Sequence, residues 1–227
     1  MCNEACIGFV LGVLPSGAVS GKRILEVGSY DTTGSVRPGI EALGPASYVG
    51  VDIMPGPSVD VVCDVMDLSE RFGAESFDVV ISTEMVEHVR DWRRAFRNMF
   101  DVLAIGGLLV VTTRSRGFPW HPAPEDFWRY EPGDMAAITY GMDVLAIDQD
   151  ALSPGVFVGA RRTVAAMADL REIALYSMIT RRRALNVTDG DIRRFNWTTP
   201  HRIGRHVPGP IRRSVKRMWI ATGRPPT

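Results

Sequence analysis

Hydrophobic and polar positions along the chain fall into two alternating patterns, which predict strands and helices in turn. Short runs rich in β-branched and apolar residues recur through the first 160 residues, bounded by glycine, proline or polar turn residues. Such runs are typical of strands buried on both faces of a sheet. Strands are predicted in this way at residues 23–28, 47–53, 60–65, 77–82, 108–113, 144–148 and 155–160.

Residues 91–103 give the clearest helical pattern between these strands. From Trp92 onward, apolar residues recur at spacings of three and four and form one apolar stripe. The "AIGG" at residues 104–107 then predicts the end of this helix, because glycine favours a left-handed turn. We expect further helices over residues 1–20, covering the core, and over residues 164–180.

The order of these elements predicts an α/β fold around a mostly parallel sheet. Consecutive parallel strands need a long crossover, which the segments between the first five strands can supply. The last two strands are joined only by the turn "QDALSP", which predicts an antiparallel hairpin at the sheet edge. The expected architecture is a seven-stranded sheet with helices on both faces.

The composition is that of a globular protein, with 45% hydrophobic residues. The apolar run at residues 5–14 is too short for a bilayer, which needs about 20 residues. It also lacks the basic leader and the cleavage pattern of a signal peptide. The cysteines Cys2, Cys6 and Cys63 give no paired framework. We therefore expect a reduced, cytoplasmic protein without a membrane span.

The charges are divided unequally along the chain, although the net charge is zero. Residues 1–160 contain 11 Lys/Arg and 22 Asp/Glu, whereas residues 161–227 contain 15 and 4. Such a basic extension can bind nucleic acid, anionic lipid or an acidic partner. Because the rest of the chain is acidic, the simplest expectation is that the extension binds its own core or that of a second subunit. This expectation favours a homodimer and makes nucleic acid an improbable partner.

A glycine loop follows the first predicted strand, in the stretch "RILEVGSYDTTGS" at residues 23–35. A glycine turn between a strand and a helix lets the backbone approach a ligand and directs helix N–H groups at it. Asp52 ends the second strand, where an acid can accept hydrogen bonds from ribose hydroxyls. Asp64 ends the third, where a carboxylate can bind an adenine amino group. A dehydrogenase would use a similar loop, but here only Gly28 and Gly34 remain of the glycines in its fingerprint.

Five segments occur in the order and at the spacing of a known family: "LEVGS", "VGVDI", "CDVMDL", "FDVVISTEMVEHV" and "LAIGGLLVVTT". Over about residues 22–160 the chain resembles the S-adenosylmethionine-dependent methyltransferases of class I, type 11 group. The resemblance implies a Rossmann-like class I methyltransferase fold and an enzyme that uses S-adenosylmethionine. It implies a cofactor-binding domain at residues 1–163, followed by a helical and basic extension at 164–227.

The resemblance also implies which residues bind the cofactor. Glu26 would hold the methionine amino group, and Gly28 would admit the cofactor beside the backbone. Asp52 would bind the ribose and Asp64 the adenine, while the residues after the fourth strand would line the sulfonium pocket. The full implied set is Glu26, Gly28, Ser29, Gly34, Asp52, Ile53, Asp64, Val65, Thr83 and Glu84.

The loop after the fifth strand, "RSRGFPWHPAPEDFWRYEP" at residues 114–132, is expected to bind the methyl acceptor. Ligands of open α/β sheets bind outside the carboxyl ends of the strands. Aromatic rings beside polar groups suit a sugar ring or another flat, hydroxylated acceptor; alternatively, these rings pack the loop onto the sheet. Similar loops occur in relatives associated with glycan or natural-product pathways, which favours O-methylation of a saccharide. The expected acceptor-binding residues are Arg114, Trp120, Trp128 and Tyr130.

Transfer to a hydroxyl needs a base that removes its proton, and His121 is the first candidate. An imidazole with a pKa of about 6.5 can accept a proton at neutral pH. His88 is the second candidate, although its position in "EMVEHV" favours packing at the start of a helix. Asp126 or Glu125 could orient His121 or replace it.

No spacing in the sequence demands a metal, and none is assigned. As an alternative, His121, Glu125 and Asp126 could hold a divalent cation such as Mg²⁺ that binds adjacent acceptor hydroxyls. Three other functions stay open. They are methyl transfer to a different small molecule, methyl transfer to RNA, and cofactor binding without turnover.

Overall fold

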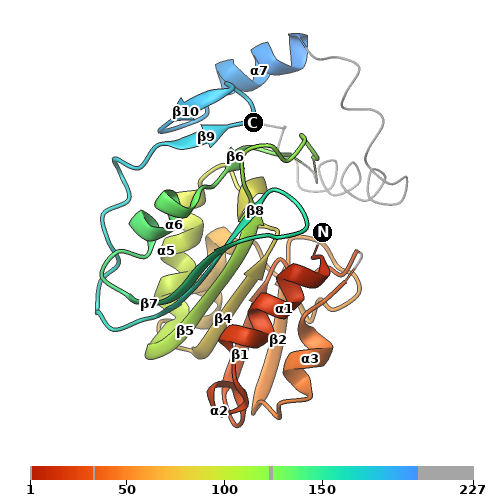
Figure 1. Ribbon diagram of the computed structural model, residues 1–227, viewed down its shortest axis with the longest axis vertical. Coiled ribbons are helices and arrows are strands. Elements are labelled where there is room, and N and C mark those ends of the chain that lie inside the picture. Colours follow the sequence, from red (N-terminus) through yellow and green to blue (C-terminus); the bar gives the residue numbers. More distant parts are fainter. Residues whose placement is uncertain (1, 33, 123–124, 199–227) are drawn as a thin grey trace.

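The computed structural model describes residues 2–32, 34–122 and 125–198 (Figure 1). Seven strands form the central sheet: β1 (Arg23–Val27), β2 (Ser47–Asp52), β3 (Val61–Val62), β4 (Phe77–Thr83), β5 (Leu103–Arg114), β7 (Asp143–Gln149) and β8 (Gly155–Arg161). They lie in the order β3-β2-β1-β4-β5-β8-β7. The first five are parallel to their neighbours, whereas β8 is antiparallel to both β5 and β7. The predicted Rossmann-like fold and its edge hairpin are confirmed.

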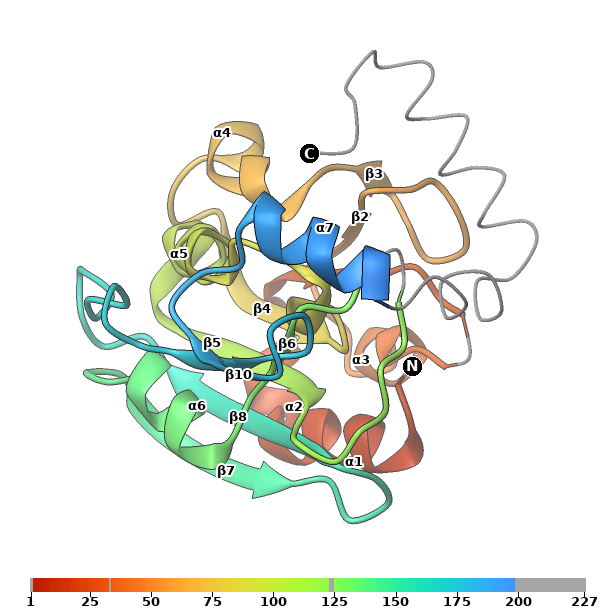
Figure 2. The ribbon, with the colours of Figure 1, turned by 90° about the horizontal axis from the view of Figure 1, so that it is seen from above.

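Helices cover both faces of this sheet (Figures 1 and 2). One face carries α1 (Glu4–Val13), α2 (Ser16–Val19) and α3 (Arg37–Glu41), and the other carries α4 (Leu68–Phe72), α5 (Trp92–Val102) and α6 (Pro132–Ile138). Adjacent residues of β1 show how the strands serve both layers, since Ile24 packs with the first group and Leu25 with the second. Each described helix is too short or too polar to cross a bilayer.

Three local predictions need correction. The N-terminal helix is two helices, because Pro15 separates them. The third strand pairs over two residues only, because Asp64 caps a 3-10 turn, η1 (Val65–Asp67), where the strand was expected to continue. The helix α5 ends at Val102 on an extended residue, so Gly106, at φ +83°, lies within β5 and does not cap the helix.

A second, three-stranded sheet lies beyond the carboxyl ends of the parallel strands (Figure 1). It consists of β6 (Trp128–Arg129), β9 (Leu175–Ser177) and β10 (Arg182–Ala184), and all its pairings are antiparallel. The helix predicted over residues 164–180 is therefore wrong. Residues 164–174 form no regular element, and β9 adds to the edge that β6 offers, so tertiary pairing overrides the local pattern.

Arg93 on α5 ties this extension to the main domain. Its guanidinium donates hydrogen bonds to the carbonyl oxygens of Leu170 at 2.7 Å, Ile173 at 2.5 Å and Leu185 at 2.6 Å. The last described helix of the extension is α7 (Asp189–Thr198) (Figure 2). Its Asp189 pairs with Arg90, which follows η2 (Val86–His88), and its Phe195 ring contacts Trp120 in the loop after β5. The basic segment predicted to bind the core or a second subunit continues at 199–227, outside the described residues.

Candidate functional site

A cavity of about 610 Å³ lies at the carboxyl ends of β1, β2 and β4. All ten residues implied to bind the cofactor line it, and so do His88 and His121. Two groups of ionisable residues lie at this cavity. We call Glu26, Asp52 and Asp64, which line it, the acidic end. We call His88 and His121, which also line it, together with the fully buried Glu87, the histidine cluster.

The turn after β1 requires glycine at two positions. Gly28 has φ +81°, and a Cβ there would lie 2.6 Å from the Cβ of Met85. At Gly34, with φ +156°, a Cβ would lie 2.9 Å from the carbonyl oxygen of Cys2. Tyr30 replaces a further glycine of the usual loop, and Gly56 makes room for its ring, since a Cβ on Gly56 would lie 2.1 Å from that ring. The altered loop is therefore accommodated, and the backbone at Gly28 stays open to the cavity.

The three acids of the acidic end differ in their surroundings. Glu26 is 2% exposed, accepts a hydrogen bond from the Tyr48 hydroxyl at 2.8 Å, and has its pKa raised to about 7 by burial. Asp52 accepts backbone N–H bonds from Tyr30 at 3.4 Å and Met54 at 3.0 Å, and burial raises its pKa. Asp64 is exposed, and only its Oδ1 is engaged, by the N–H of Met66 at 3.0 Å. Each acid therefore presents carboxylate oxygen to the cavity.

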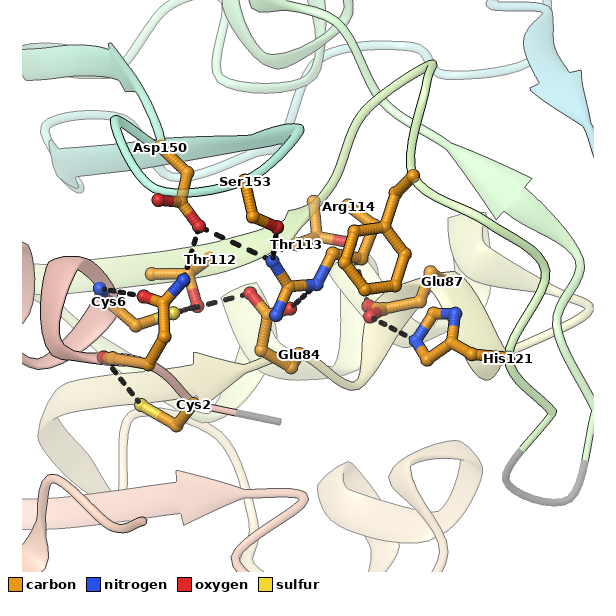
Figure 3. A network of polar contacts seen from close by, with 12 residues as sticks. Cys2, Cys6, Glu84, Glu87, Thr112, Thr113, Arg114, His121, Asp150 and Ser153 are labelled. Atoms are coloured by element: carbon orange, nitrogen blue, oxygen red, sulfur yellow. Dashed lines mark hydrogen bonds and ion pairs between the residues drawn. The ribbon is translucent and has the colours of Figure 1, made fainter. Parts of the chain in front are cut away.

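The histidine cluster joins the end of η2 to the loop after β5 (Figure 3). Glu87 Oε1 lies 3.7 Å from His88 Nε2 and 3.7 Å from His121 Nε2. The other Glu87 oxygen accepts a hydrogen bond from the Thr113 hydroxyl at 2.8 Å. Although burial alone would raise the pKa of Glu87, its two histidine neighbours hold it below the usual range. Burial lowers the pKa of His88.

His121 is held in place by Asp126. Its Nδ1 lies 3.1 Å from Asp126 Oδ2, and the same oxygen accepts its backbone N–H at 2.8 Å. Arg129 in turn grips both Asp126 oxygens, at 2.5 and 2.7 Å, and the Arg129 and Asp126 side chains are fully buried. Burial would lower the pKa of His121, but Asp126 and Glu87 together raise it. This arrangement places His121 Nε2 3.7 Å from Glu87 Oε1, and the side chain of His121 lines the cavity.

Glu84 belongs to a separate buried network beside the cluster (Figure 3). It sits at φ +55° directly after β4 and pairs with Arg114, which also contacts Asp150 at 3.3 Å. The thiol of Cys6 donates to Glu84 Oε1 at 3.3 Å. Burial and the nearby Glu87 charge raise the pKa of Glu84 well above its usual value. The network fixes the wall between the two parts of the cavity.

Several predicted acceptor residues do not face the cavity. Trp128 and Tyr130 are both 0% exposed, and their polar atoms donate to backbone carbonyls of residues 86–90, so stacking on an acceptor is contradicted and the packing alternative holds. Arg114 is buried in the Glu84 network and is also not a cavity residue. Trp120 is half-buried against the ring of Phe195 in α7, 5.8 Å away.

The metal alternative must also be corrected. Arg129 and His121 engage the oxygens of Asp126, so Asp126 orients His121 and is not available to a cation. Glu125 contributes its backbone carbonyl to His88 Nδ1 at 2.5 Å. The residue missed from the sequence is Glu87. The signal was present in "EMVEHV", where a carboxylate precedes a histidine at the end of a buried strand, but that segment was attributed to packing.

Comparison with known proteins identifies the overall type of this chain. A family model described as a methyltransferase domain matches residues 4–145. No curated protein matches the chain significantly.

Solved structures share its fold. An S-adenosylmethionine-dependent methyltransferase from Mesorhizobium loti is 19% identical, with a TM-score of 0.54 over 70% of this chain and 99% of its own. The 1,6-didemethyltoxoflavin-N1-methyltransferase of Burkholderia thailandensis, solved with S-adenosylhomocysteine, is 14% identical, with a TM-score of 0.58 over 71% and 80%. A Haloferax volcanii methyltransferase complexed with the activator Trm112 is 13% identical, with a TM-score of 0.54 over 73% and 91%. At these identities the likeness shows the fold alone.

Proposed function

This chain belongs to the methyltransferase-domain family, and from that premise we propose that it methylates a hydroxyl of a sugar, oligosaccharide or glycosylated metabolite. The chain is an S-adenosylmethionine-dependent methyltransferase. The hydroxyl acceptor, the saccharide class and the residues that act on it are the proposal.

The acidic end fits S-adenosylmethionine. The turn at Gly28 lines the cavity with its backbone, and glycine is required there by φ +81° and by Met85, which a Cβ would meet. Glu26 offers a carboxylate to an ammonium group, Asp52 offers one to ribose hydroxyls, and Asp64 offers one to an adenine amino group. When bound, the cofactor supplies an activated methyl group.

One observation carries the hydroxyl assignment: His121 lines the cofactor cavity, and its Nε2, 3.7 Å from Glu87 Oε1, forms no hydrogen bond. With Nδ1 donating its proton to Asp126, the lone pair of His121 resides on Nε2. In this proposal Nε2 accepts the proton of the acceptor hydroxyl, and Asp126 and Glu87 stabilise the resulting imidazolium. Transfer to a sulfur or an unprotonated nitrogen would need no such base.

The saccharide class is supported by the character of the loop after β5. Its resemblance to loops in relatives of glycan pathways supports a saccharide acceptor, although the side chains of Trp128 and Tyr130 are buried in the core. Trp120 remains the aromatic candidate for contact with a sugar ring, because its side chain is only half-buried, although it packs against Phe195 and does not line the cavity. Polar side chains of the histidine cluster would meet the hydroxyls of such an acceptor.

Methyl transfer to nitrogen is the second candidate. It is favoured by the Burkholderia thailandensis neighbour, which is named as an N1-methyltransferase. The two candidates differ in their need for a base. Replacement of His121 by alanine should abolish transfer to a hydroxyl and leave transfer to an unprotonated nitrogen nearly unchanged.

A methyl-transfer screen tests the proposal. Labelled S-adenosylmethionine is incubated with sugars, oligosaccharides, phenols, heteroaromatic amines and RNA, and the product bond is identified by mass spectrometry and NMR. The expected product is a methyl ether on a sugar hydroxyl, formed by the wild type and not by Asp52→Ala at low cofactor concentration. An N-methylated product, or methylation of RNA alone, would overturn the saccharide assignment.

A further inference from the structure

The histidine cluster contains three ligand-type atoms that converge without forming hydrogen bonds with one another. Glu87 Oε1, His88 Nε2 and His121 Nε2 all lie within 4.8 Å of one another. The two carboxylate–imidazole separations are 3.7 Å each, which is too long for a hydrogen bond. The site lies on the cavity wall, since both histidines line the cavity.

Two of these atoms are buried and form no hydrogen bond. Glu87 is 0% exposed, and its Oε1 and the Nε2 of His121, which lie 3.7 Å apart, are both without a hydrogen bond. Buried polar atoms that form no hydrogen bond are costly, and native proteins normally satisfy them with protein, water or an ion. The side chains of the cluster therefore leave two buried polar atoms without a hydrogen bond.

The outer contacts of the cluster have the form that metal-binding histidines adopt. Each histidine uses its Nδ1 on a fixed acceptor, the Glu125 carbonyl oxygen for His88 and the Asp126 carboxylate for His121. Glu87 Oε2 is fixed by the Thr113 hydroxyl. Such contacts set the tautomer and orientation of a metal ligand, and they leave each remaining lone pair directed at one point.

We propose that Glu87, His88 and His121 bind one divalent first-row transition-metal ion, such as Mn²⁺, Fe²⁺, Co²⁺ or Zn²⁺. Two imidazoles and one carboxylate suit these ions better than Mg²⁺, which prefers oxygen ligands. Ligand bonds of about 2.0–2.2 Å require the three atoms to be about 3–3.5 Å apart, so the side chains need only rotate inward from their present separations.

Three protein ligands leave coordination positions that face the cavity. The inference rests on the proposed function for what fills them: adjacent hydroxyl oxygens of the acceptor. A hydroxyl bound to the ion releases its proton to water, because the cation lowers the pKa of the oxygen it binds. In the loaded protein the lone pair of His121 is donated to the ion, so the ion takes over the activation that His121 provides in the metal-free protein.

Metal binding can be measured without cofactor or acceptor. The full-length protein is dialysed against EDTA and titrated with Co²⁺, and the visible absorption of the ion and the heat of binding are followed. We expect one Co²⁺ per chain, with visible bands typical of nitrogen and oxygen ligands. His88→Ala and His121→Ala should each weaken binding by at least 100-fold. Asp126→Asn, which alters the orienting partner of His121 and also the pair of Asp126 with Arg129, should weaken it by about 10–100-fold.

The other two histidines of the chain provide the matched control. The double variant His201→Ala/His206→Ala should bind Co²⁺ as the wild type does. Loss of binding in that variant, wild-type binding in His121→Ala, or absence of stoichiometric binding would each overturn the inference. Circular dichroism of each variant separates loss of ligands from loss of fold.

The outcome is independent of the proposed function. If Co²⁺ fails to bind but a sugar hydroxyl is methylated in EDTA, the metal inference fails and the proposed function stands. If Co²⁺ binds to the cluster but only nitrogen is methylated, the site stands and the hydroxyl proposal fails.

Discussion

The acidic end and the histidine cluster line one cavity, but they are assembled in different ways. Glu26 lies within β1, Asp52 ends β2 and Asp64 follows β3, and the N–H groups of Met54 and Met66 orient Asp52 and Asp64. The histidine cluster draws its side chains from η2 and from the loop after β5. Thr113 holds Glu87, the Glu125 carbonyl oxygen holds His88, and Asp126 holds His121. The acidic end is thus positioned by sheet topology, and the cluster by a network of buried pairs.

The largest effect that separates the two regions is expected for His121→Ala. Loss of a positioned group that acts on the acceptor should lower turnover by about 10²–10⁴-fold. Because His121 is not among the groups that suit the cofactor, affinity for S-adenosylhomocysteine should stay unchanged. Turnover and calorimetric affinity, measured on the same folded sample, check both halves of the statement. A parallel loss of affinity would mean that the two regions are not separable.

The next largest effect is expected for Arg129→Met and concerns stability. This change leaves the fully buried Asp126 carboxylate without its guanidinium partner. Breaking one side of a buried ion pair typically costs about 3–5 kcal/mol. The free energy of unfolding in urea measures it. Arg171→Met, which removes an exposed pair with Asp169, is the control and should leave the unfolding transition in place.

Glu26→Gln tests the acidic end. We expect it to weaken cofactor binding and to stabilise the folded protein at high pH. The folded-state pKa of Glu26 is about 7, above the unfolded value of 4.5. The folded protein therefore binds the proton of the Glu26 carboxyl more tightly than the unfolded chain does. The free energy of unfolding gained in this way is fully present below pH 4.5 and is lost as the pH rises through about 7.

The glutamine variant does not titrate and should escape this loss, which amounts to about 3 kcal/mol. Its unfolding free energy should change less than that of the wild type between pH 4.5 and pH 8. At pH 8 its affinity for S-adenosylhomocysteine should be lower, because the carboxylate is gone. An unfolding curve that depends on pH as strongly as the wild type would contradict the assignment.

The smallest of these effects is expected for Asp52→Ala. A lost hydrogen bond to a charged group is worth about 1.5–3 kcal/mol, so affinity for S-adenosylhomocysteine should fall by about 10–150-fold. Turnover at saturating cofactor should be retained, in contrast to His121→Ala. Glu70→Ala, an exposed acid on α4, is the control and should bind as the wild type does. Unchanged affinity in Asp52→Ala would remove it from the cofactor site.

The same difference decides how much the sequence could predict. The acidic end follows from strand periodicity, because the residue after a buried strand must lie at the carboxyl edge of the sheet. Composition could not show which aromatic residues of the loop are buried: Trp128 pairs with Ser177 of β9, almost 50 residues later, and the Tyr130 hydroxyl donates to the carbonyl oxygen of Val86. The local pattern at residues 164–180 predicted a helix, but residues 175–177 of this segment form β9, which pairs with the edge of β6. Glu87 was missed because a buried carboxylate is recognised by its partners, and two of them, Thr113 and His121, lie far along the chain.

The contact between β6 and β9 has a consequence for the order in which the protein is made. Residues 128–129 leave the ribosome well before their partners at 176–177. At about 5–20 residues per second, this gap is about 2–10 s. The hydrogen bond from the Arg93 guanidinium to the carbonyl oxygen of Leu185 can form only later, because 92 residues separate the two. During synthesis the central sheet can therefore form on a nascent chain in which β6 still lacks its pairing with β9, and the contacts between the loop after β5 and the extension form last.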